Sequence, residues 1–214
     1  VSLQMPRDRW SLFLTGPRLG PAVLFWSLLL VVGLLAFGLG RSRLTPLGMV
    51  QWALLGIGLT QVPVNSAVLV IFWLLALGVR ERLGVVEKPL NHNLLQIGLV
   101  FLSLLALSLL FDAVSRGLLG YPSMQISGND SSAFQLNWYQ DRAVKVPDRA
   151  TVISAPLWVY RGVMLAWALW LAFALLRWLK WGWSVLARDG LWRKLAINPR
   201  GWRIAKSKDD APAP

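Results

Sequence analysis

The chain of 214 residues contains no cysteine and a single histidine, His92. These two facts exclude disulfides, iron–sulfur clusters and thiolate metal sites, and any metal or haem site within this chain that needs two histidine ligands. The sequence also lacks the G-x-S-x-G, Walker and H-E-x-x-H motifs and any motif of paired carboxylates. We therefore predict no catalytic residues, no cofactor and no metal, and a protein that is not an enzyme.

Charge is scarce and mostly of one sign. Only 15% of the residues are charged, and 22 Lys and Arg against 10 Asp and Glu give a net charge of +12. Such a basic chain could bind nucleic acid, but most of its Lys and Arg stand just beyond apolar runs. There they would meet the anionic headgroups of a lipid bilayer. We expect the bilayer as a partner and no nucleic acid.

Hydrophobic residues, by contrast, make up 56% of the chain, which is too many for an ordinary soluble domain. We expect an all-α integral membrane fold of about five transmembrane helices. The apolar runs cover residues 21–40, 46–62, 64–82, 94–119 and 155–183. Together they form an expected membrane domain over residues 21–187. In the first run, Ala36 and Gly40 are spaced i,i+4, which permits close approach of another helix.

The second and third runs are expected to form a hairpin of two short helices. Pro63 disfavours helical geometry at Val62, and Asn65 or Ser66 can cap a new helix. A single bent helix over 46–82 would be far longer than one crossing needs. The apolar run 67–79 spans only about 20 Å. The hairpin is therefore expected to be tilted, to thin the bilayer locally or to be re-entrant.

Three segments lie outside the expected spans. Residues 1–20 contain two short strand-like pieces, but their Pro and Gly breakers favour an extended extracytoplasmic lead-in segment. Residues 120–154 are expected to form a small extracytoplasmic segment on the membrane, either a β-hairpin or a structured loop, because FQLNWY and ATVIS have strand-like character. Residues 188–214 are interpreted as a basic cytoplasmic segment, with an amphipathic interfacial helix followed by a disordered tail.

Basic residues orient these helices across the membrane. From Arg177 onward the chain holds nine Lys or Arg, and further basic residues occupy the short loops after the first and third runs: Arg41, Arg43, Arg80, Arg82 and Lys88. Cytoplasmic loops are enriched in Lys and Arg. Five crossings, with the N-terminus outside and the C-terminus inside, place all of these residues in the cytoplasm.

The fifth run carries the candidate partner site. At about 100° per residue, its tryptophans fall within an arc of about 80°; they are Trp167, Trp170, Trp178 and Trp181. Arg161, Ala168 and Ala172 lie on the opposite side. Small side chains favour packing inside the bundle, so we expect the tryptophan face to meet lipid or to bind another protein. The alternative is an aromatic belt at the membrane interface.

Other polar residues in the spans have mainly structural interpretations. Asp112 and Arg161 stand near the outer ends of consecutive helices and are expected to form a structural ion pair, with a gate or proton relay as the functional alternative. Asp112 could instead pair with Arg116 at i,i+4. His92 is expected to be a polar residue of a helix cap region. Gln96 and Ser103 share a helix face, which predicts interhelical hydrogen bonds.

Several strings of the sequence resemble the C-terminal membrane region of large uncharacterised bacterial inner-membrane proteins. They are GPRLGPAVLFW, RLTPL, NWYQDR and PLWVYRGVMLAWALWLA. The resemblance implies no activity and no functional residue. It implies a location in the bacterial inner membrane and a larger extracytoplasmic portion before residue 1, which agrees with a chain that begins at Val1 rather than Met.

The leading hypothesis from the sequence is a non-enzymatic membrane anchor and assembly subunit. It would hold a periplasmic region at the membrane and dock other membrane subunits through the fifth helix. The alternative, from another functional class, is a component of a transporter or channel in which the short 46–82 hairpin is a gate element. The spans contain few ionisable groups, which favours the anchor over the transporter or channel component.

Overall fold

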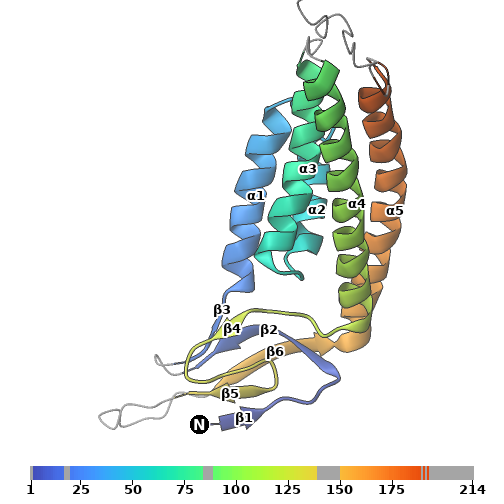
Figure 1. The fold of residues 1–214 in the computed structure, drawn as a ribbon. Helices are drawn as coiled ribbons and strands as arrows, with labels where there is room; N and C mark the ends of the chain where they lie inside the picture. The colour runs from blue at the N-terminus through green and yellow to red at the C-terminus, as the bar shows by residue number, and fades with distance from the viewer. Residues whose placement is uncertain are drawn as a thin grey trace, which may run out of the picture.

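The helices of the described residues stand side by side, and a layer of short strands covers one end of them (Figure 1). The computed structural model describes residues 2–16, 20–83, 89–138, 150–188, 190 and 192. The helices are α1 (Phe25–Arg41), α2 (Met49–Leu59), α3 (Val64–Arg82), α4 (Pro89–Leu119) and α5 (Leu157–Ala187). The predicted interfacial helix and tail over 188–214 fall outside the described residues, apart from 188, 190 and 192.

Three of the helices, α3, α4 and α5, are long and apolar enough to cross a membrane, while α1 and α2 are shorter apolar helices. The predicted hairpin is present: α2 ends at Leu59, and α3 begins at Val64 directly after Pro63. Its first arm is shorter than predicted, because the chain stays irregular from Ser42 to Gly48 before Met49 starts the helix. The helix α4 starts five residues earlier than expected, at Pro89, a residue suited to a first helical turn.

The strand layer shows that two expectations about the flanking segments are wrong. Residues 1–20 are not an extended lead-in, since they contain β1 (Ser2–Gln4) and β2 (Arg9–Thr15). Nor, among the described residues, do the strands of the 120–154 segment form the hairpin with one another. The remaining strands are β3 (Ala22–Val23), β4 (Ile126–Ser127), β5 (Gln135–Asn137) and β6 (Thr151–Pro156).

Each strand of the N-terminal part pairs antiparallel with a strand of the later segment. The pairs are β1 with β5, β2 with β6 and β3 with β4. The first run was expected to be helical from residue 21, but β3 occupies Ala22–Val23 and the helix starts only at Phe25. Backbone groups of a lone strand need partners, and segments far apart in the sequence supply them here.

The core runs through the middle of the bundle, where α2, α3, α4 and α5 contribute large apolar side chains and α1 contributes Ala36. Its most deeply buried members include Leu55, Trp73, Leu74, Leu110 and Leu171. Close approach of helices is possible where one of them has a small residue. Ala36 is buried and Gly40 lies against the backbone of Met49, so the predicted small surface of the first helix does pack closely, against α2.

The register of β2 on β6 can be tested because the chain has no native cysteine. Leu14 lies opposite Val152 in this pair. Directly opposed residues in antiparallel strands are close enough for a disulfide. We expect Leu14→Cys/Val152→Cys to lose both free thiols on mild oxidation, as measured by thiol titration.

The matched control is Leu14→Cys/Ile153→Cys, in which the second side chain points to the other face of the ribbon. It should keep its two thiols under the same conditions. Oxidation of the control as readily as of the test variant would contradict the register.

Candidate functional site

The tryptophan face of α5 lies inside the bundle. Trp167 is 7% exposed and Trp178 is 2% exposed, while Trp170 and Trp181 are half-buried against the same core. On the other side of α5, Arg161 and Ala172 are exposed. The prediction that these tryptophans face a partner is therefore wrong, and of the two small residues predicted to pack inside, Ala172 is exposed while Ala168 is half-buried against the core.

The physical reason is visible at Trp167. Its indole lies directly over Gly58 of α2, where a Cβ would overlap the ring. The indole Nε1–H donates a 2.8 Å hydrogen bond to the carbonyl oxygen of Leu54, a carbonyl that an α-helix already pairs with the N–H of Gly58. A buried indole N–H needs an acceptor, and a glycine on the neighbouring helix gives access to one. The small residue that permits this contact belongs to α2 rather than to α5.

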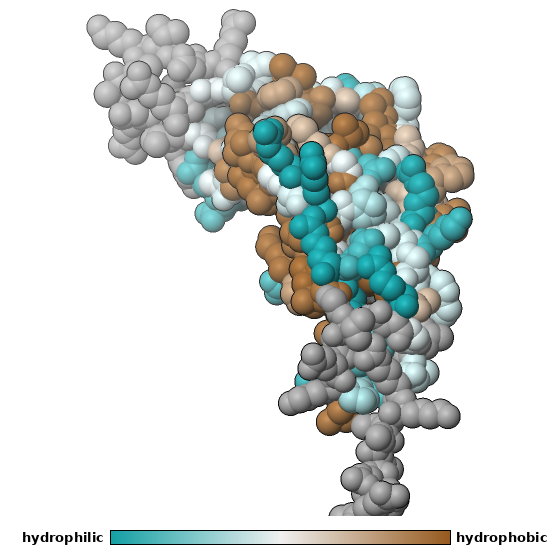
Figure 2. Space-filling view, turned by 90° about the horizontal axis from the view of Figure 1, so that it is seen from above, coloured by the Kyte–Doolittle hydropathy of each residue, from teal (hydrophilic) through white to brown (hydrophobic). Residues whose placement is uncertain are grey.

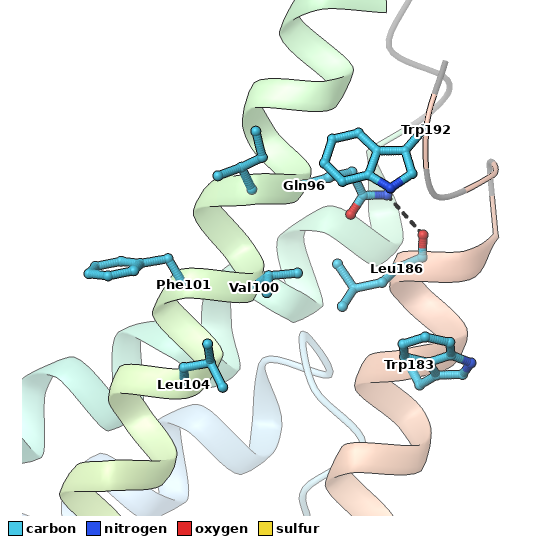
Figure 3. Close-up of a pocket in the computed structure, with 8 residues that line it drawn as sticks. Gln96, Val100, Phe101, Leu104, Trp183, Leu186 and Trp192 are labelled. Carbon is cyan, nitrogen blue, oxygen red and sulfur yellow. Dashed lines mark hydrogen bonds between the residues drawn. The ribbon is translucent and has the colours of Figure 1, made fainter. Parts of the chain in front are cut away.

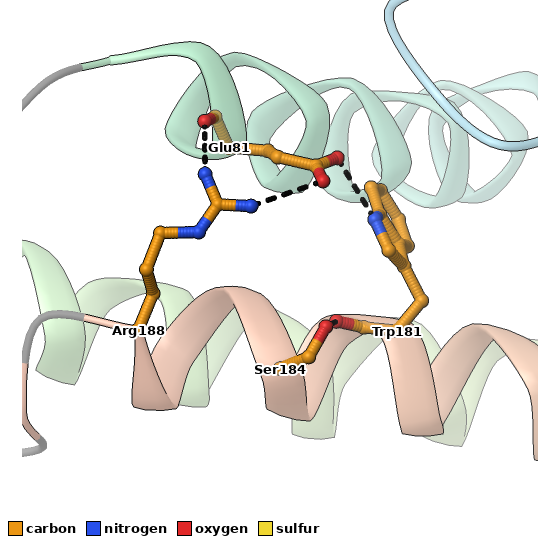
Figure 4. A network of polar contacts seen from close by, with 4 residues as sticks. All are labelled: Glu81, Trp181, Ser184 and Arg188. Atoms are coloured by element: carbon orange, nitrogen blue, oxygen red, sulfur yellow. Dashed lines mark hydrogen bonds and ion pairs between the residues drawn. The ribbon is translucent and has the colours of Figure 1, made fainter.

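Trp181 joins a polar network at the end of the bundle away from the strands (Figure 4). Its Nε1–H donates to a carboxylate oxygen of Glu81 on α3 at 2.9 Å. Arg188, just past α5, donates to the other carboxylate oxygen at 3.2 Å and to the Glu81 carbonyl at 2.7 Å. This network holds the C-terminal ends of α3 and α5 together.

The two polar residues predicted to make interhelical hydrogen bonds do so. The indole of Trp73 on α3 donates to the Ser103 hydroxyl oxygen at 2.8 Å. Gln96 Nε2 donates to the carbonyl of Leu186 on α5 at 2.8 Å (Figure 3). A hydrogen bond between helices in an apolar medium contributes about 1 kcal/mol. This prediction is confirmed for both residues.

The predicted ion pair between Asp112 and Arg161 is not formed. Asp112 pairs instead with Arg116 one turn further along α4, at 2.8 Å, and Arg161 is exposed on α5. Asp112 therefore forms the alternative pair, with Arg116 at i,i+4. Both partners are substantially exposed, so the pair stabilises the helix only weakly.

His92 is completely buried, at the start of α4. Its Nε2 lies 3.1 Å from the carbonyl oxygen of Gly190, four residues after the carbonyl that Gln96 binds. The two side chains, one turn apart on α4, thus contact one carbonyl in the last turn of α5 and one in the chain just after it. His92 is a polar residue near a helix start, as expected, and its contact joins that start to the chain after α5.

An apolar groove of about 350 Å³ adjoins this contact, between α4 and the end of α5 (Figure 3). The α4 side chains in its wall include Val100, Phe101 and Leu104, and Trp183 and Leu186 contribute from α5. Gln96 is its polar lining residue. The wall offers van der Waals contact and almost no hydrogen bonding.

Basic side chains gather at the same end of the bundle. Figure 2 looks onto this end and shows hydrophilic side chains clustered there, with hydrophobic ones around them. The basic residues of the helix ends and the α1–α2 turn are Arg41, Arg43, Arg80, Arg82, Lys180 and Arg188. Arg80 is buried. The sequence predicted that the turn after the first helix and the end of the third share one side of the membrane, and the fold brings them together.

Contacts across the α1–α2 turn order three of these arginines. The guanidinium of Arg82 donates to the carbonyl oxygens of Ser42 and Arg43. Arg43 has a φ of 52°, in the left-handed region that a non-glycine residue rarely adopts. Arg41 lies over the ring of Phe37, 5.9 Å from its centroid. Sequence reasoning missed the contact of Arg82 with the α1–α2 turn, because only the fold brings the end of α3 to the carbonyl groups of that turn.

Within the described part of the chain, no group of three or more His, Cys, Asp or Glu side chains is placed to hold a metal ion. Comparison with protein families, curated proteins and solved structures finds no significant match to this chain. The arrangement offers helix contacts, apolar grooves and a cluster of guanidinium groups. These features are suited to binding lipid or protein.

Substitution of Gly58 tests the helix contact at Trp167. In Gly58→Ala the new methyl group would overlap the buried indole. We expect the free energy of unfolding in detergent to fall by about 1–3 kcal/mol, as in overpacked cores. Thermal unfolding followed by circular dichroism would measure it.

The matched control is Gly98→Ala on α4, where an added Cβ meets nothing within 4 Å. It should leave stability unchanged or raise it slightly, because alanine is the better helix former. Equal behaviour of the two variants would contradict the close packing of Trp167 on Gly58.

Proposed function

We propose that this chain is a non-enzymatic, multi-pass membrane anchor of the bacterial inner membrane. In this proposal the helices span the bilayer, the strand layer lies on the extracytoplasmic side, and the basic end lies in the cytoplasm. The domain positions whatever is joined to the strand layer and assembles with other membrane or periplasmic subunits.

The observation that carries the proposal is a band of exposed large apolar side chains around the bundle. On α4 it includes Phe101, Leu104 and Phe111, and on α5 it includes Leu169, Phe173 and Leu176. A protein dissolved in water rarely exposes a continuous apolar surface of this extent. In a bilayer, the same side chains would lie against acyl chains at no cost.

The charges at the two ends support the proposed orientation. Among the described residues, the half of the bundle away from the strands has seven basic side chains, the six named above and Arg177 of α5, and one acidic one, Glu81. The strand end is nearly balanced: Arg7, Arg9, Arg116 and Arg161 accompany Asp8, Asp112 and Asp130. An excess of Lys and Arg marks the cytoplasmic side.

The strand layer is joined firmly to the helices, as an anchor requires. β6 runs directly into α5, and the N–H of Leu157 donates to the carbonyl of Asp8 at 2.8 Å. The rings of Trp10 and Tyr160 meet edge to face, 5.4 Å between centroids. On the α1 side, Trp26 donates to the Leu12 carbonyl at 2.9 Å. Force applied to the N-terminal strands would therefore pass to both α1 and α5.

The packing of the 46–82 hairpin favours an anchor over a gate element. On α2, Trp52, Leu55 and Leu59 are buried in the core. The hairpin turn is tied to the segment after α4, where Gln61 Oε1 accepts a hydrogen bond from the Ser123 N–H at 2.9 Å. A gate must move between two arrangements, and these contacts instead hold the hairpin in one place.

Single cysteines in the cysteine-free chain test the proposal. We expect Ala133→Cys, exposed near β5, to react with a membrane-impermeant maleimide in cells whose outer membrane alone is opened. Leu83→Cys, exposed just after α3, should react only after the inner membrane is also opened. Leu104→Cys lies in the apolar band and should react in neither case, because maleimides need the thiolate in water.

Labelling is read by the mass shift of the purified protein, with the cysteine-free parent as control. Reaction of Leu83→Cys from the outside would reverse the orientation. Rapid reaction of Leu104→Cys with the impermeant reagent would contradict membrane insertion of the bundle.

A further inference from the structure

The helix α1 is too short to cross the hydrocarbon core of a bilayer by itself. Its 17 residues give a length of about 25 Å, against about 30 Å for that core. Figure 1 shows that α1 ends above the strand layer, whereas α4 and α5 extend down to the level of the layer. With Arg41 at the basic end, the outer end of α1 at Phe25 therefore falls short of the hydrocarbon boundary by roughly one helical turn.

The ribbon of β2 and β6 has a face that carries aromatic and aliphatic side chains. Trp10 lies opposite Ala155, and Phe13 lies opposite Ile153. Alternate residues of β6, such as 153 and 155, point to one face, and directly opposed residues share a face. Trp10 and Phe13 therefore lie on the same face, because the register shift after Ser11 adds one residue to β2.

Contacts with two helices show that this face is directed towards the bundle. Trp10 packs against the helix core and meets Tyr160 of α5 edge to face. Phe13 stacks on Trp26, in the first turn of α1, with 4.7 Å between the ring centroids. The hydrogen bond from Trp26 to the Leu12 carbonyl holds this stack in place. The strand layer thus turns Phe13 towards the membrane side rather than away from it.

A column of exposed apolar side chains runs from this face up the outer surface of α1. Ile153 is 56% exposed beside Phe13, which is 45% exposed under Trp26. Above the stack, Trp26, Leu30 and Leu34 follow one another at i,i+4 spacing on one side of the helix, and all three are exposed. The column therefore joins the ribbon to the apolar band of the bundle.

The composition and position of the ribbon identify lipid as its partner. Segments 10–15 and 151–156 contain no charged residue, although exposed strands in water commonly carry charged side chains. Ile153 lies about 5 Å from Phe13 across the ribbon, and so at the depth that α1 leaves uncovered. A protein partner would have to reach this face from within the outer leaflet.

We infer that the ribbon face with Phe13 and Ile153 is inserted into the outer leaflet and completes the membrane span that α1 begins. Its partner is the lipid at the boundary between headgroups and acyl chains, where amphipathic aromatic residues such as Trp26 are favoured. The inference rests on the proposed membrane location of the helices. It makes this part of the strand layer a component of the membrane interface, and it explains how a helix of this length avoids thinning the bilayer.

Spin labels in the cysteine-free chain test the inference. Ile153→Cys and Gln135→Cys each receive a nitroxide, in the full chain reconstituted into vesicles of phosphatidylethanolamine and phosphatidylglycerol. Gln135 is the matched control, because it is exposed on β5, on the side of the layer away from the helices (Figure 1). Power-saturation electron paramagnetic resonance compares collisions of each label with oxygen, which concentrates among acyl chains, and with a water-soluble nickel chelate.

We expect the ratio of oxygen to nickel collisions to be several-fold higher at position 153 than at position 135. The same preference for the nickel chelate at both positions would place the ribbon face in water and overturn the inference. Protection of the label at 153 from both reagents would show a protein contact in place of lipid, which would overturn it equally.

Depth in the bilayer provides a second, independent measurement. A bimane fluorophore on Ile153→Cys is compared in vesicles whose lipids are brominated either near the headgroup or near the middle of the bilayer. We expect stronger quenching by the bromines near the headgroup, and the opposite order for Leu104→Cys, halfway along α4. Absence of quenching at 153 by either lipid would contradict insertion of the ribbon.

A nitroxide on Leu104→Cys also separates this inference from the proposed function. A label at 104 that the nickel chelate cannot reach, together with one at 153 that it reaches freely, would keep the anchor and remove the interfacial contact. Free access of the chelate to the label at 104 would remove both.

Discussion

Indole N–H groups that cross from one helix to another hold this bundle in register. Trp73 joins α3 to α4, Trp167 joins α5 to α2, and Trp181 joins α5 to α3. Each ring buries a large apolar area and also carries one donor that an apolar interior forces to find an acceptor. A hydrophobic surface alone would let the helices slide, whereas these bonds select one alignment.

The alignment determines what the two ends and the outer surface of the bundle present. The strand layer can pair because α1 and α5 bring Arg9–Thr15 and Thr151–Pro156 to the same end. The opposite end collects the guanidinium groups of the α1–α2 turn and of α3. Between them the surface is apolar. This order of surfaces supports the proposed membrane anchor, in which the charge at the basic end would fix the depth and the direction of the bundle in the membrane.

Comparison of α5 with its sequence shows where pattern reasoning fails in such a protein. Around the axis of α5 the tryptophans lie on the side opposite Ala168 and Ala172. The rule that small residues face the bundle interior therefore predicted the wrong inward face for this helix. The glycines that receive the large side chains of α5 stand on other helices: Gly58 receives Trp167, and Gly117 receives Met164. The small residue of α5 that is fully buried is Ala174, on the tryptophan side. Where lipid and core are equally apolar, hydrophobicity cannot distinguish the two faces of a helix. Only complementary shape and available acceptors distinguish them.

The sequence by itself determined the helical segments, the hairpin break at Pro63, the interhelical roles of Gln96 and Ser103, and the side shared by Arg41, Arg43 and Arg82. These depend on local geometry, on the length of apolar runs and on the cost of unpaired polar groups, all of which are properties of short stretches of chain. Only the tertiary structure decided the strand pairs, the inward face of α5, which of the two possible partners Asp112 takes, and the contact of His92 with the chain after α5. Each of those depends on which acceptor, strand edge or glycine a distant segment places nearby. Such contacts between distant segments cannot be predicted from the pattern of a short stretch of sequence.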